Sequence, residues 1–234
     1  MGGLDKVGFQ VRVQGIRFVV LLVVFCLVWL VSLGGCKKQE NLSENTVKVV
    51  RALDGDTVLL HNGERLRYAG IDTPELNHGK GLPPQPFAEE AYRLNKRLTE
   101  GKVFRLKASL KEKDHYGRLL GDLYFENGTS VSEILVREGL ALVCYFPGSA
   151  DYYHKLLPLQ AEVVKKRKGF FSLLDKQPKG VVYIGNKQSK RFHHPDCTEA
   201  KRIKRKVYFK SLEEAFLEGY CPSRECFDKI FPGY

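Results

Sequence analysis

Short runs of alternating apolar and polar residues dominate the chain from residue 47 onward. They predict five β-strands, several of them separated by the Asp-Gly and Asn-Gly pairs typical of hairpin turns, at residues 47–52, 57–60, 65–69, 103–109 and 119–125. Apolar residues spaced by three and four predict three helices, at residues 86–98, 131–138 and 152–168. Gly101, Gly139 and Gly169 are expected to end these helices. The pattern predicts a mixed β+α fold in which the strands form a small barrel.

A change in composition follows the third predicted helix. Residues 176–180 are polar and contain Pro178, and the residues after them hold three of the six cysteines. We therefore predict two modules, a barrel domain at residues 47–177 and a small Cys/His module at residues 178–234.

The first 35 residues indicate a targeting segment. A basic stretch precedes an apolar run at residues 18–33, and Leu-Gly-Gly-Cys at residues 33–36 resembles the bacterial lipobox, whose cysteine receives a diacylglycerol. We expect a signal peptide at residues 1–35, a lipid on Cys36 and a polar tether at residues 36–46. The alternative is an uncleaved membrane anchor, for which sixteen residues are few against the roughly 20 that a spanning helix needs. Both interpretations place the remaining chain outside the cytoplasm.

Charge narrows the class of partner. The formal net charge is +11 at pH 7, and the basic residues are spread along the chain. Such basicity suits nucleic acid or an anionic membrane surface without choosing between them. The apolar and charged fractions, 43% and 28%, are those of a globular protein and exclude global disorder.

Charged residues gather at three turns of the predicted barrel. The segments are Asp-Gly-Asp-Thr at residues 54–57, Arg-Tyr-Ala-Gly-Ile-Asp-Thr-Pro-Glu at residues 67–75 and Asp-His-Tyr-Gly-Arg at residues 114–118. Each alone is typical of a turn or a solvated strand. Together and in this order, they resemble the signature segments of the staphylococcal nuclease family over residues 47–174. The resemblance implies a calcium-dependent nuclease on an OB-fold barrel.

The resemblance also implies a calcium site. It places the ion at the carboxylates of Asp56 and Asp72 and at the backbone carbonyl of Thr73, with Asp54 in the surrounding shell. Oxygen atoms of this kind are the ligands that calcium prefers in proteins.

The other residues of these segments take roles in binding and hydrolysis by the same resemblance. Arg67 and Arg118 correspond to the pair that clamps the phosphate, where planar guanidinium groups form paired hydrogen bonds and stabilise developing negative charge. Glu75 corresponds to the glutamate that orients or deprotonates the attacking water, and the sequence leaves both roles open. Tyr116 and Tyr145 correspond to residues that border the nucleotide.

His193, Cys197, Cys221 and Cys226 stand out in the C-terminal module. Their arrangement resembles the metal-binding domain of the bacterial DNA methylphosphotriester repair protein, in which four thiolates hold zinc. Three cysteines and one histidine would satisfy tetrahedral zinc. A disulfide between Cys221 and Cys226 is the competing interpretation, because exported proteins meet oxidising conditions, and it leaves Cys197 and Cys144 free or paired. Unpaired thiols are the third alternative.

These expectations combine into one function. We expect a monomeric, lipid-anchored, extracytoplasmic nuclease that hydrolyses DNA and RNA with Ca²⁺ and carries Zn²⁺ in its C-terminal module. One rival is an inactive OB-fold lipoprotein that only binds nucleic acid, and the intact set of acidic residues and arginines argues against it. A structural lipoprotein is the other rival.

Overall fold

The computed structural model describes residues 46–76, 83–108 and 113–232, all within one compact unit that spans residues 43–234. The predicted signal peptide, Cys36 and all of the tether before Thr46 lie outside these residues. Within the described residues, no helix has both the length and the apolar character needed to cross a membrane.

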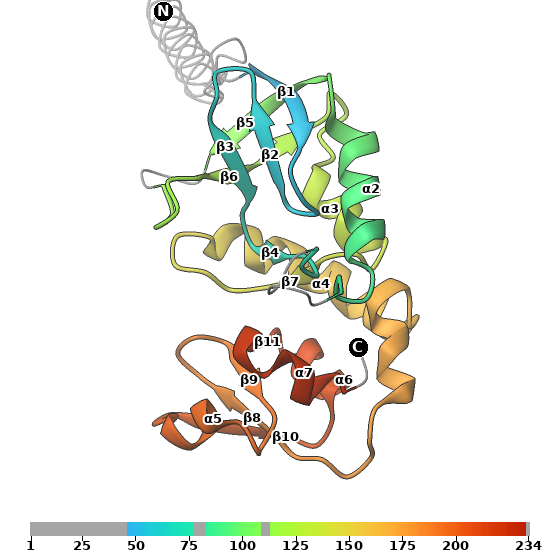
Figure 1. The fold of residues 1–234 in the computed structure, drawn as a ribbon, viewed down its shortest axis with the longest axis vertical. Helices are drawn as coiled ribbons and strands as arrows, with labels where there is room; N and C mark the ends of the chain where they lie inside the picture. The colour runs from blue at the N-terminus through green and yellow to red at the C-terminus, as the bar shows by residue number, and fades with distance from the viewer. Residues whose placement is uncertain (1–45, 77–82, 109–112, 233–234) are drawn as a thin grey trace, which may run out of the picture. The chain divides into compact units, whose positions relative to one another are not determined.

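Five strands close into a barrel in the order β1, β2, β3, β6, β5 (Figure 1). Their bounds are Thr46–Ala52 (β1), Thr57–Leu60 (β2), Arg65–Tyr68 (β3), Val103–Ala108 (β5) and Leu119–Tyr124 (β6). Neighbouring strands run antiparallel, except for the parallel pair β3 and β6. Val49, Val58 and Leu66 come from three of these strands and bury fully in one cluster. The predicted five-stranded barrel is confirmed.

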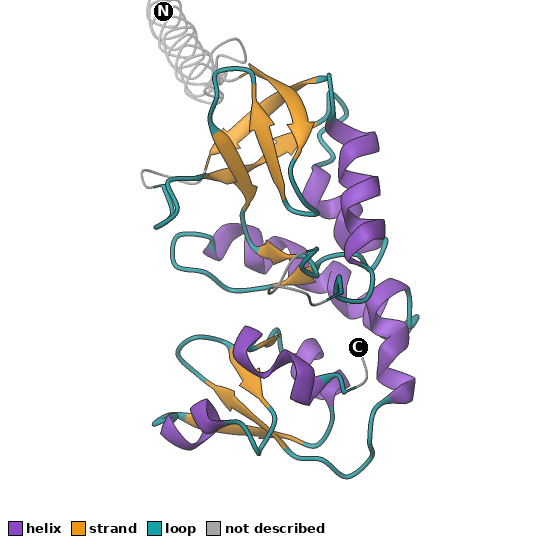
Figure 2. Ribbon diagram, in the orientation of Figure 1, coloured by secondary structure: helices purple, strands orange, loops and turns teal. Residues whose placement is uncertain are grey.

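The three predicted helices are present, with shifted ends; in the view of Figures 1 and 2, α2 and α3 lie beside the barrel and α4 runs below it. They are α2 (Ala88–Thr99), α3 (Val131–Arg137) and α4 (Ala150–Lys165). α2 begins two residues later than predicted, because Phe87 has a φ of 67°. Gly139 supplies a left-handed φ of 69° after α3, where a Cβ would collide with the carbonyl of Lys168. The expected stop at Gly169 is wrong, because α4 ends at Lys165 and the chain already turns left-handed at Arg167, with a φ of 53°; Gly169, with a φ of 57°, lies beyond the helix end.

A two-stranded ribbon lies outside the barrel sheet. β4 (Ile71–Asp72) pairs antiparallel with β7 (Leu142–Val143), which sets Asp72 opposite Leu142. Each strand has only two residues, too few for any alternation to be visible in the sequence.

The C-terminal residues form a second sheet in the order β10, β8, β9, β11. Its strands are β8 (Tyr183–Asn186), β9 (Arg191–His193), β10 (Lys206–Phe209) and β11 (Cys221–Pro222). Short helices accompany them: η1 (Gly169–Lys176), α5 (Thr198–Arg202), α6 (Leu212–Leu217), η2 (Arg224–Cys226) and α7 (Phe227–Ile230). β11 runs parallel to β9, so Cys221 lies opposite Arg191.

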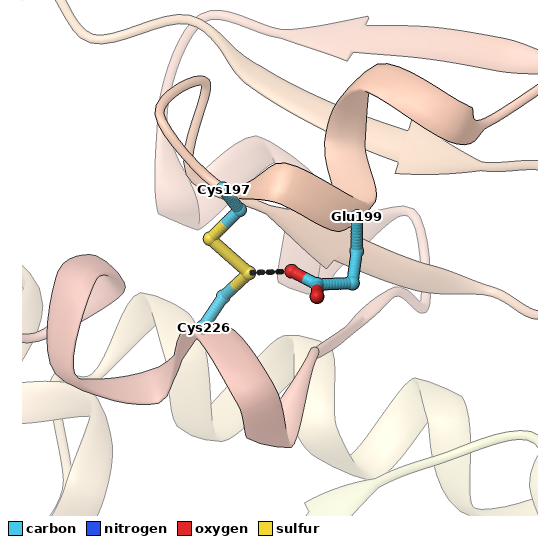
Figure 3. Close-up of side chains that lie close together, drawn as sticks. All are labelled: Cys197, Glu199 and Cys226. Carbon is cyan, nitrogen blue, oxygen red and sulfur yellow. Dashed lines mark hydrogen bonds between the residues drawn. A yellow bond between two sulfur atoms is a disulfide. The ribbon is translucent and has the colours of Figure 1, made fainter.

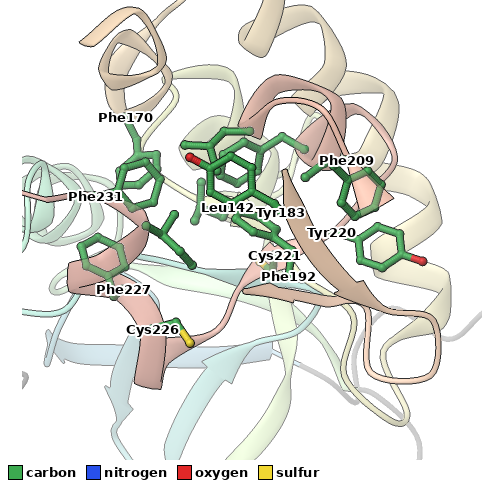
Figure 4. Packing of buried hydrophobic residues seen from close by; sticks show 14 of the residues in the cluster. Leu142, Phe170, Tyr183, Phe192, Phe209, Tyr220, Cys221, Cys226, Phe227 and Phe231 are labelled. Atoms are coloured by element: carbon green, nitrogen blue, oxygen red, sulfur yellow. The ribbon is translucent and has the colours of Figure 1, made fainter. Parts of the chain in front are cut away.

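An aromatic core joins residues on both sides of residue 178. Phe170 of η1 packs edge-on against Phe231, with ring centroids 5.0 Å apart, and against Phe216 at 6.4 Å. Figure 4 shows Phe170, Phe192 and Phe231 in this cluster. The C-terminal sheet therefore shares its core with η1, which precedes residue 178. The division of the chain into two modules near residue 178 remains a prediction.

Buried hydrogen bonds also connect α4 to the C-terminal residues. The amide of Gln160, which is fully buried, accepts the N–H of Val143 at 2.6 Å and donates to the carbonyl of Phe216 at 2.9 Å. The hydroxyl of Tyr153 donates to the carbonyl of Gly219 at 2.9 Å. The bond from Val143 gives its buried N–H a partner, and the carbonyl of Phe216 accepts the N–H of Gly219 as well as the amide of Gln160.

Two disulfides occupy the cysteines of the C-terminal module. Cys144 is bonded to Cys221, with Cα atoms 5.4 Å apart, and Cys197 to Cys226, with Cα atoms 6.1 Å apart. The expected zinc set of His193, Cys197, Cys221 and Cys226 is not supported, because zinc binds thiolates and each of these three cysteines is in a disulfide. The alternative pairing of Cys221 with Cys226 is wrong, since the partner of Cys221 lies before the module.

A carboxylate and an imidazole lie next to the disulfide between Cys197 and Cys226. A carboxylate oxygen of Glu199 lies 3.9 Å from Sγ of Cys226 (Figure 3), and Nδ1 of His193 lies 3.4 Å from the same sulfur. The structure thus brings His193, Cys197 and Cys226 together, as the resemblance implied, but around a disulfide.

Candidate active site

A tight turn between β1 and β2 carries the first acidic residues. The carboxylate of Asp54 accepts the N–H of Asp56 at 2.9 Å. Gly55 lets the turn pack closely, because a Cβ at this position would lie 2.5 Å from Oγ1 of Thr73. Burial, and then the neighbouring charge of Asp56, raise the pKa of Asp54 to about 7. The turn therefore holds Asp56 beside Thr73.

Asn95 of α2 supports this turn from the helix side. Its Nδ2 donates to the carbonyl of Asp54 at 2.8 Å, and its Oδ1 accepts the hydroxyl of Tyr68 at 2.8 Å. Sequence reasoning missed Asn95, although a polar residue within the apolar stripe that includes Ala91 and Leu94 was a usable signal.

Arg67 of β3 lies between two buried carboxylates. Its Nη2 is 2.6 Å from Oδ1 of Asp72 and 3.1 Å from Oδ2 of Asp56, and its Nη1 donates to the carbonyl of Ile71 at 2.9 Å. The N–H of Thr73 donates to the same Oδ2 of Asp56 at 3.2 Å. Arg67, Asp56 and Asp72 are only 4%, 5% and 8% exposed. The structure thus brings together four residues that the sequence singled out.

Arg118 lies beside the turn from another direction. Its Nε donates to Oδ2 of Asp114 at 2.8 Å, and its Nη1 lies 3.4 Å from Oγ1 of Thr57. Thr57 in turn donates its hydroxyl to Asp56 at 2.9 Å. The guanidinium also lies 5.2 Å from the ring of Tyr116, which is exposed. Asp114 therefore aims Arg118 toward the acidic cluster.

Glu75 lies at the edge of the cluster. Its N–H donates to Oε1 of Gln85 at 2.8 Å, and its carboxylate is 3.1 Å from Nη2 of Arg224. Burial raises the pKa of Glu75, although Arg224 opposes the shift. A carboxylate with a raised pKa is a better acceptor for a proton from water. Gln85 carried no sequence signal, because it lies among prolines without periodicity.

Two arginines of the C-terminal residues reach Asp72 as well. Nη2 of Arg224 lies 2.6 Å from Oδ1 of Asp72, and Nη1 of Arg191 lies 3.6 Å from its Oδ2. Burial disfavours the charged form of Asp72, but Arg67, Arg224 and Arg191 outweigh it and hold the pKa of Asp72 below its ordinary value. Sequence reasoning missed Arg191 and Arg224, because no spacing in the chain relates them to Asp72.

A pocket of about 600 Å³ opens beside these residues. Cationic and aromatic side chains from both parts of the chain line it: Arg67, Tyr116, Arg118, Phe146, Arg191 and Arg224. Tyr145, expected at the nucleotide, instead packs edge-on against Tyr153, with ring centroids 5.6 Å apart. Its neighbour Phe146 is the aromatic residue at that wall. The pocket suits an anion whose groups can stack on an aromatic ring.

The acidic residues fit a hard cation by their donor chemistry. Asp56 and Asp72 each place one oxygen next to the same nitrogen of Arg67, so two carboxylates already converge on positive charge. Oxygen donors of this kind suit calcium. Within the described residues, Asp56, Asp72 and Glu75 do not form a cluster of three ligand atoms within 4.8 Å of one another. Arginine side chains neutralise them instead.

Comparison with known proteins identifies the family of this chain. A family model described as staphylococcal nuclease homologue matches residues 65–173. The thermonuclease of Staphylococcus hyicus is 30% identical over 164 residues, which are 68% of this chain and 96% of that protein. Endonuclease YncB of Bacillus subtilis is 39% identical over 113 residues, 47% of this chain and 52% of that protein. The SPbeta prophage-derived endonuclease YokF of Bacillus subtilis is 41% identical over 103 residues, 42% of this chain and 34% of that protein. The chain belongs to the staphylococcal nuclease family and is a nuclease that hydrolyses phosphodiester bonds.

Proposed function

We propose that this protein is a calcium-dependent nuclease that cleaves DNA and RNA outside the cytoplasm, as a monomer held at a bacterial membrane by a lipid on Cys36. The observation that carries the catalytic part is the meeting of Asp56, Asp72 and Arg67 in one buried cluster beside a pocket that Arg118 lines. The Leu-Gly-Gly-Cys sequence at residues 33–36 supports the anchor.

Calcium is held by Asp56, Asp72 and the backbone carbonyl of Thr73 in this proposal. When bound, the ion would supply positive charge that neutralises the phosphate oxygens, on which negative charge builds in the transition state. Asp54 acts through Asp56, because its carboxylate fixes the turn from which Asp56 projects.

Arg67 and Arg118 bind the phosphate through their guanidinium groups. Arg67 is buried, so its charge acts through a medium of low dielectric and interacts strongly with a phosphate in the pocket. Arg118 keeps its orientation through Asp114, which leaves other guanidinium N–H groups for substrate. Two planar donors on one phosphate favour the pentacoordinate transition state, in which oxygen charge increases.

Glu75 acts on the attacking water. Water attacks phosphorus and transfers a proton to the Glu75 carboxylate, while the bond from phosphorus to the leaving oxygen breaks. The leaving oxygen departs with the bonding electrons and takes up a proton from solvent water. The raised pKa of Glu75 supports this role, because its carboxylate accepts a proton more readily than an exposed glutamate does.

Digestion of labelled single-stranded DNA tests the catalytic proposal. The full chain, purified in detergent, should cleave the DNA with calcium and stop when a chelator is added. Glu75→Gln should remove most of the activity, whereas Glu90→Gln, the same change at an exposed position of α2, should retain it. DNA that is bound but intact in calcium would instead indicate a nucleic-acid-binding lipoprotein without catalysis.

A lipid-labelling experiment tests the anchor separately. Cells that express the chain are grown with a radiolabelled fatty acid, and the protein is then isolated. Cys36→Ser should leave an unlabelled precursor, because the acceptor sulfur is gone. Unchanged labelling of this variant would contradict lipidation at Cys36.

A further inference from the structure

Arg224 lies at the active site although it belongs to the C-terminal residues. Its Nη2 contacts Asp72 at 2.6 Å and Glu75 at 3.1 Å, and its side chain is 52% exposed. The guanidinium therefore contacts a proposed calcium ligand and the proposed base, while half of the side chain remains open to solvent. A group in this position can reach a bound substrate.

Arg191 lies beside the same pocket on β9. Its guanidinium lies 4.9 Å from the ring centroid of Phe146, and that of Arg67 lies 4.7 Å from the same ring. Its Nη1 also donates to the carbonyl of Pro222 at 3.3 Å. Phe146 thus aligns one guanidinium from each part of the chain along one wall of the pocket.

A disulfide and a strand pairing hold these arginines in place. Cys221 stands three residues before Arg224 and is bonded to Cys144, which stands two residues before Phe146. Cys221 also lies opposite Arg191 in the pairing of β11 with β9. The placement of both arginines therefore depends on a cross-link and a strand pairing, and not on an unsupported loop.

A bound cation changes the charge balance at these arginines. Without it, Arg67, Arg191 and Arg224 share the negative charge of Asp72 and its neighbours. A divalent cation on Asp72 takes up that charge, so Arg191 and Arg224 lose much of their neutralising partner. Positive groups in a partly desolvated site then require another anion. The phosphates of a nucleic acid supply it.

We propose that Arg191 and Arg224 form a second phosphate subsite, which binds the backbone of a nucleic-acid strand next to the phosphate held by Arg67 and Arg118. The inference rests on the proposed function and extends it, since the strand is held by residues outside the segment 65–173 that matches the family. Each guanidinium offers a planar pair of donors that matches two oxygens of a phosphodiester. The pocket that these residues line is where the strand would lie.

Steady-state kinetics on a short single-stranded DNA test the subsite. The full chain is compared with Arg191→Ala, Arg224→Ala and Arg202→Ala, in calcium and over a range of salt concentrations. Arg202 is the matched control, because it is an exposed arginine of α5 that does not line the pocket. Removal of either subsite arginine should raise KM by about tenfold, the effect of deleting one charge-assisted hydrogen bond. The value of kcat should change by less than about threefold in Arg191→Ala, because this arginine binds the strand equally in the ground state and the transition state. For Arg224→Ala, which also removes a contact to Glu75, KM and the salt dependence are the readouts.

The salt dependence gives a readout that a structural role would not change. The slope of log(kcat/KM) against log salt should become shallower by about 0.7 for each phosphate of the single strand that the variant no longer binds. Arg224→Lys should keep the wild-type slope, because its charge remains, while its KM should recover only in part. Thermal midpoints equal to that of Arg202→Ala establish that the fold is retained. If Arg191→Ala is unfolded, the comparison of Arg224→Ala with Arg202→Ala tests the subsite, because the side chain of Arg224 is half-exposed.

Two results would overturn the subsite. One is a KM and a salt slope that match those of Arg202→Ala. The other is an increase of kcat/KM at low calcium in Arg224→Ala, which would make Arg224 a competitor of the cation. An inactive wild type would count against the proposed function but not against the subsite. Fluorescence anisotropy then measures the affinity of each variant for the same oligonucleotide in calcium, and this affinity tests the subsite without catalysis.

Discussion

The disulfide between Cys144 and Cys221 should supply a large part of the stability of this fold. It links the end of β7 to β11 across 77 positions of the sequence. The double substitution Cys144→Ala/Cys221→Ala opens this loop in the unfolded chain, which gains conformational freedom that the cross-link had removed.

The expected loss of stability follows from the length of the loop. Loop-closure entropy is worth about 3 kcal/mol for 15 residues and about 4.7 kcal/mol for 100 residues, so a separation of 77 gives about 4.5 kcal/mol. Both cysteines are buried, so the missing sulfur atoms add a smaller packing loss. The disulfide from Cys197 to Cys226, at a separation of 29, should contribute less, about 3.5 kcal/mol.

Equilibrium urea unfolding of the full chain in detergent measures this difference. The wild type and the double variant are compared under oxidising conditions and again with a strong reductant. The difference of about 4.5 kcal/mol in the free energy of unfolding should shrink to the packing term in reductant, because both proteins then lack this cross-link.

Two outcomes would refute the reasoning. A difference below about 1 kcal/mol under oxidising conditions, the size of an ordinary substitution, would mean that the cross-link does not restrict the unfolded chain. An equal difference with and without reductant would assign the whole effect to packing around the two side chains.

Three further predictions concern single side chains. Burial raises the pKa of Asp122 to about 6, so this residue alone should lower the free energy of unfolding by about 3 kcal/mol between pH 4 and pH 6. In urea titrations, the wild type should lose about 3 kcal/mol more than Asp122→Asn over this range, and parallel pH profiles of the two proteins would contradict the prediction. Gln160→Leu should cost about 1 to 3 kcal/mol in urea unfolding, because the buried N–H of Val143 loses its partner, whereas the carbonyl of Phe216 still accepts the N–H of Gly219. A cost below about 0.5 kcal/mol would argue against this role of Gln160. Arg67→Lys should lower kcat/KM on single-stranded DNA about 100-fold or more, because the positive charge remains but the paired hydrogen-bond donors do not. Activity within a few-fold of wild type would exclude paired hydrogen bonds from Arg67 to the phosphate.

The barrel was predictable because its signals are local. Alternation places every second side chain of a strand on one face, and the Asp-Gly and Asn-Gly pairs mark turns between neighbouring strands. The ends of the helices were less predictable. α4 stops at Lys165, and Arg167 adopts a left-handed φ two residues before Gly169, although glycine is the residue that favours this conformation.

The C-terminal residues show where such signals fail. Their cysteines were visible in the sequence, but a sulfur atom can bind zinc or another sulfur, and spacing alone does not decide between them. The partner of Cys221 proved to be Cys144, which carried no spacing signal at all.

By itself, the sequence determined the barrel, its three helices and the placement of Asp56, Arg67 and Asp72 within a few residues of two turns. Only the tertiary structure decided that Arg224 contacts Asp72 across 152 positions. The physical reason is that turn and strand geometry fix neighbours a few residues apart. Contacts between distant segments depend on which buried surfaces pack together, and no local pattern encodes that choice.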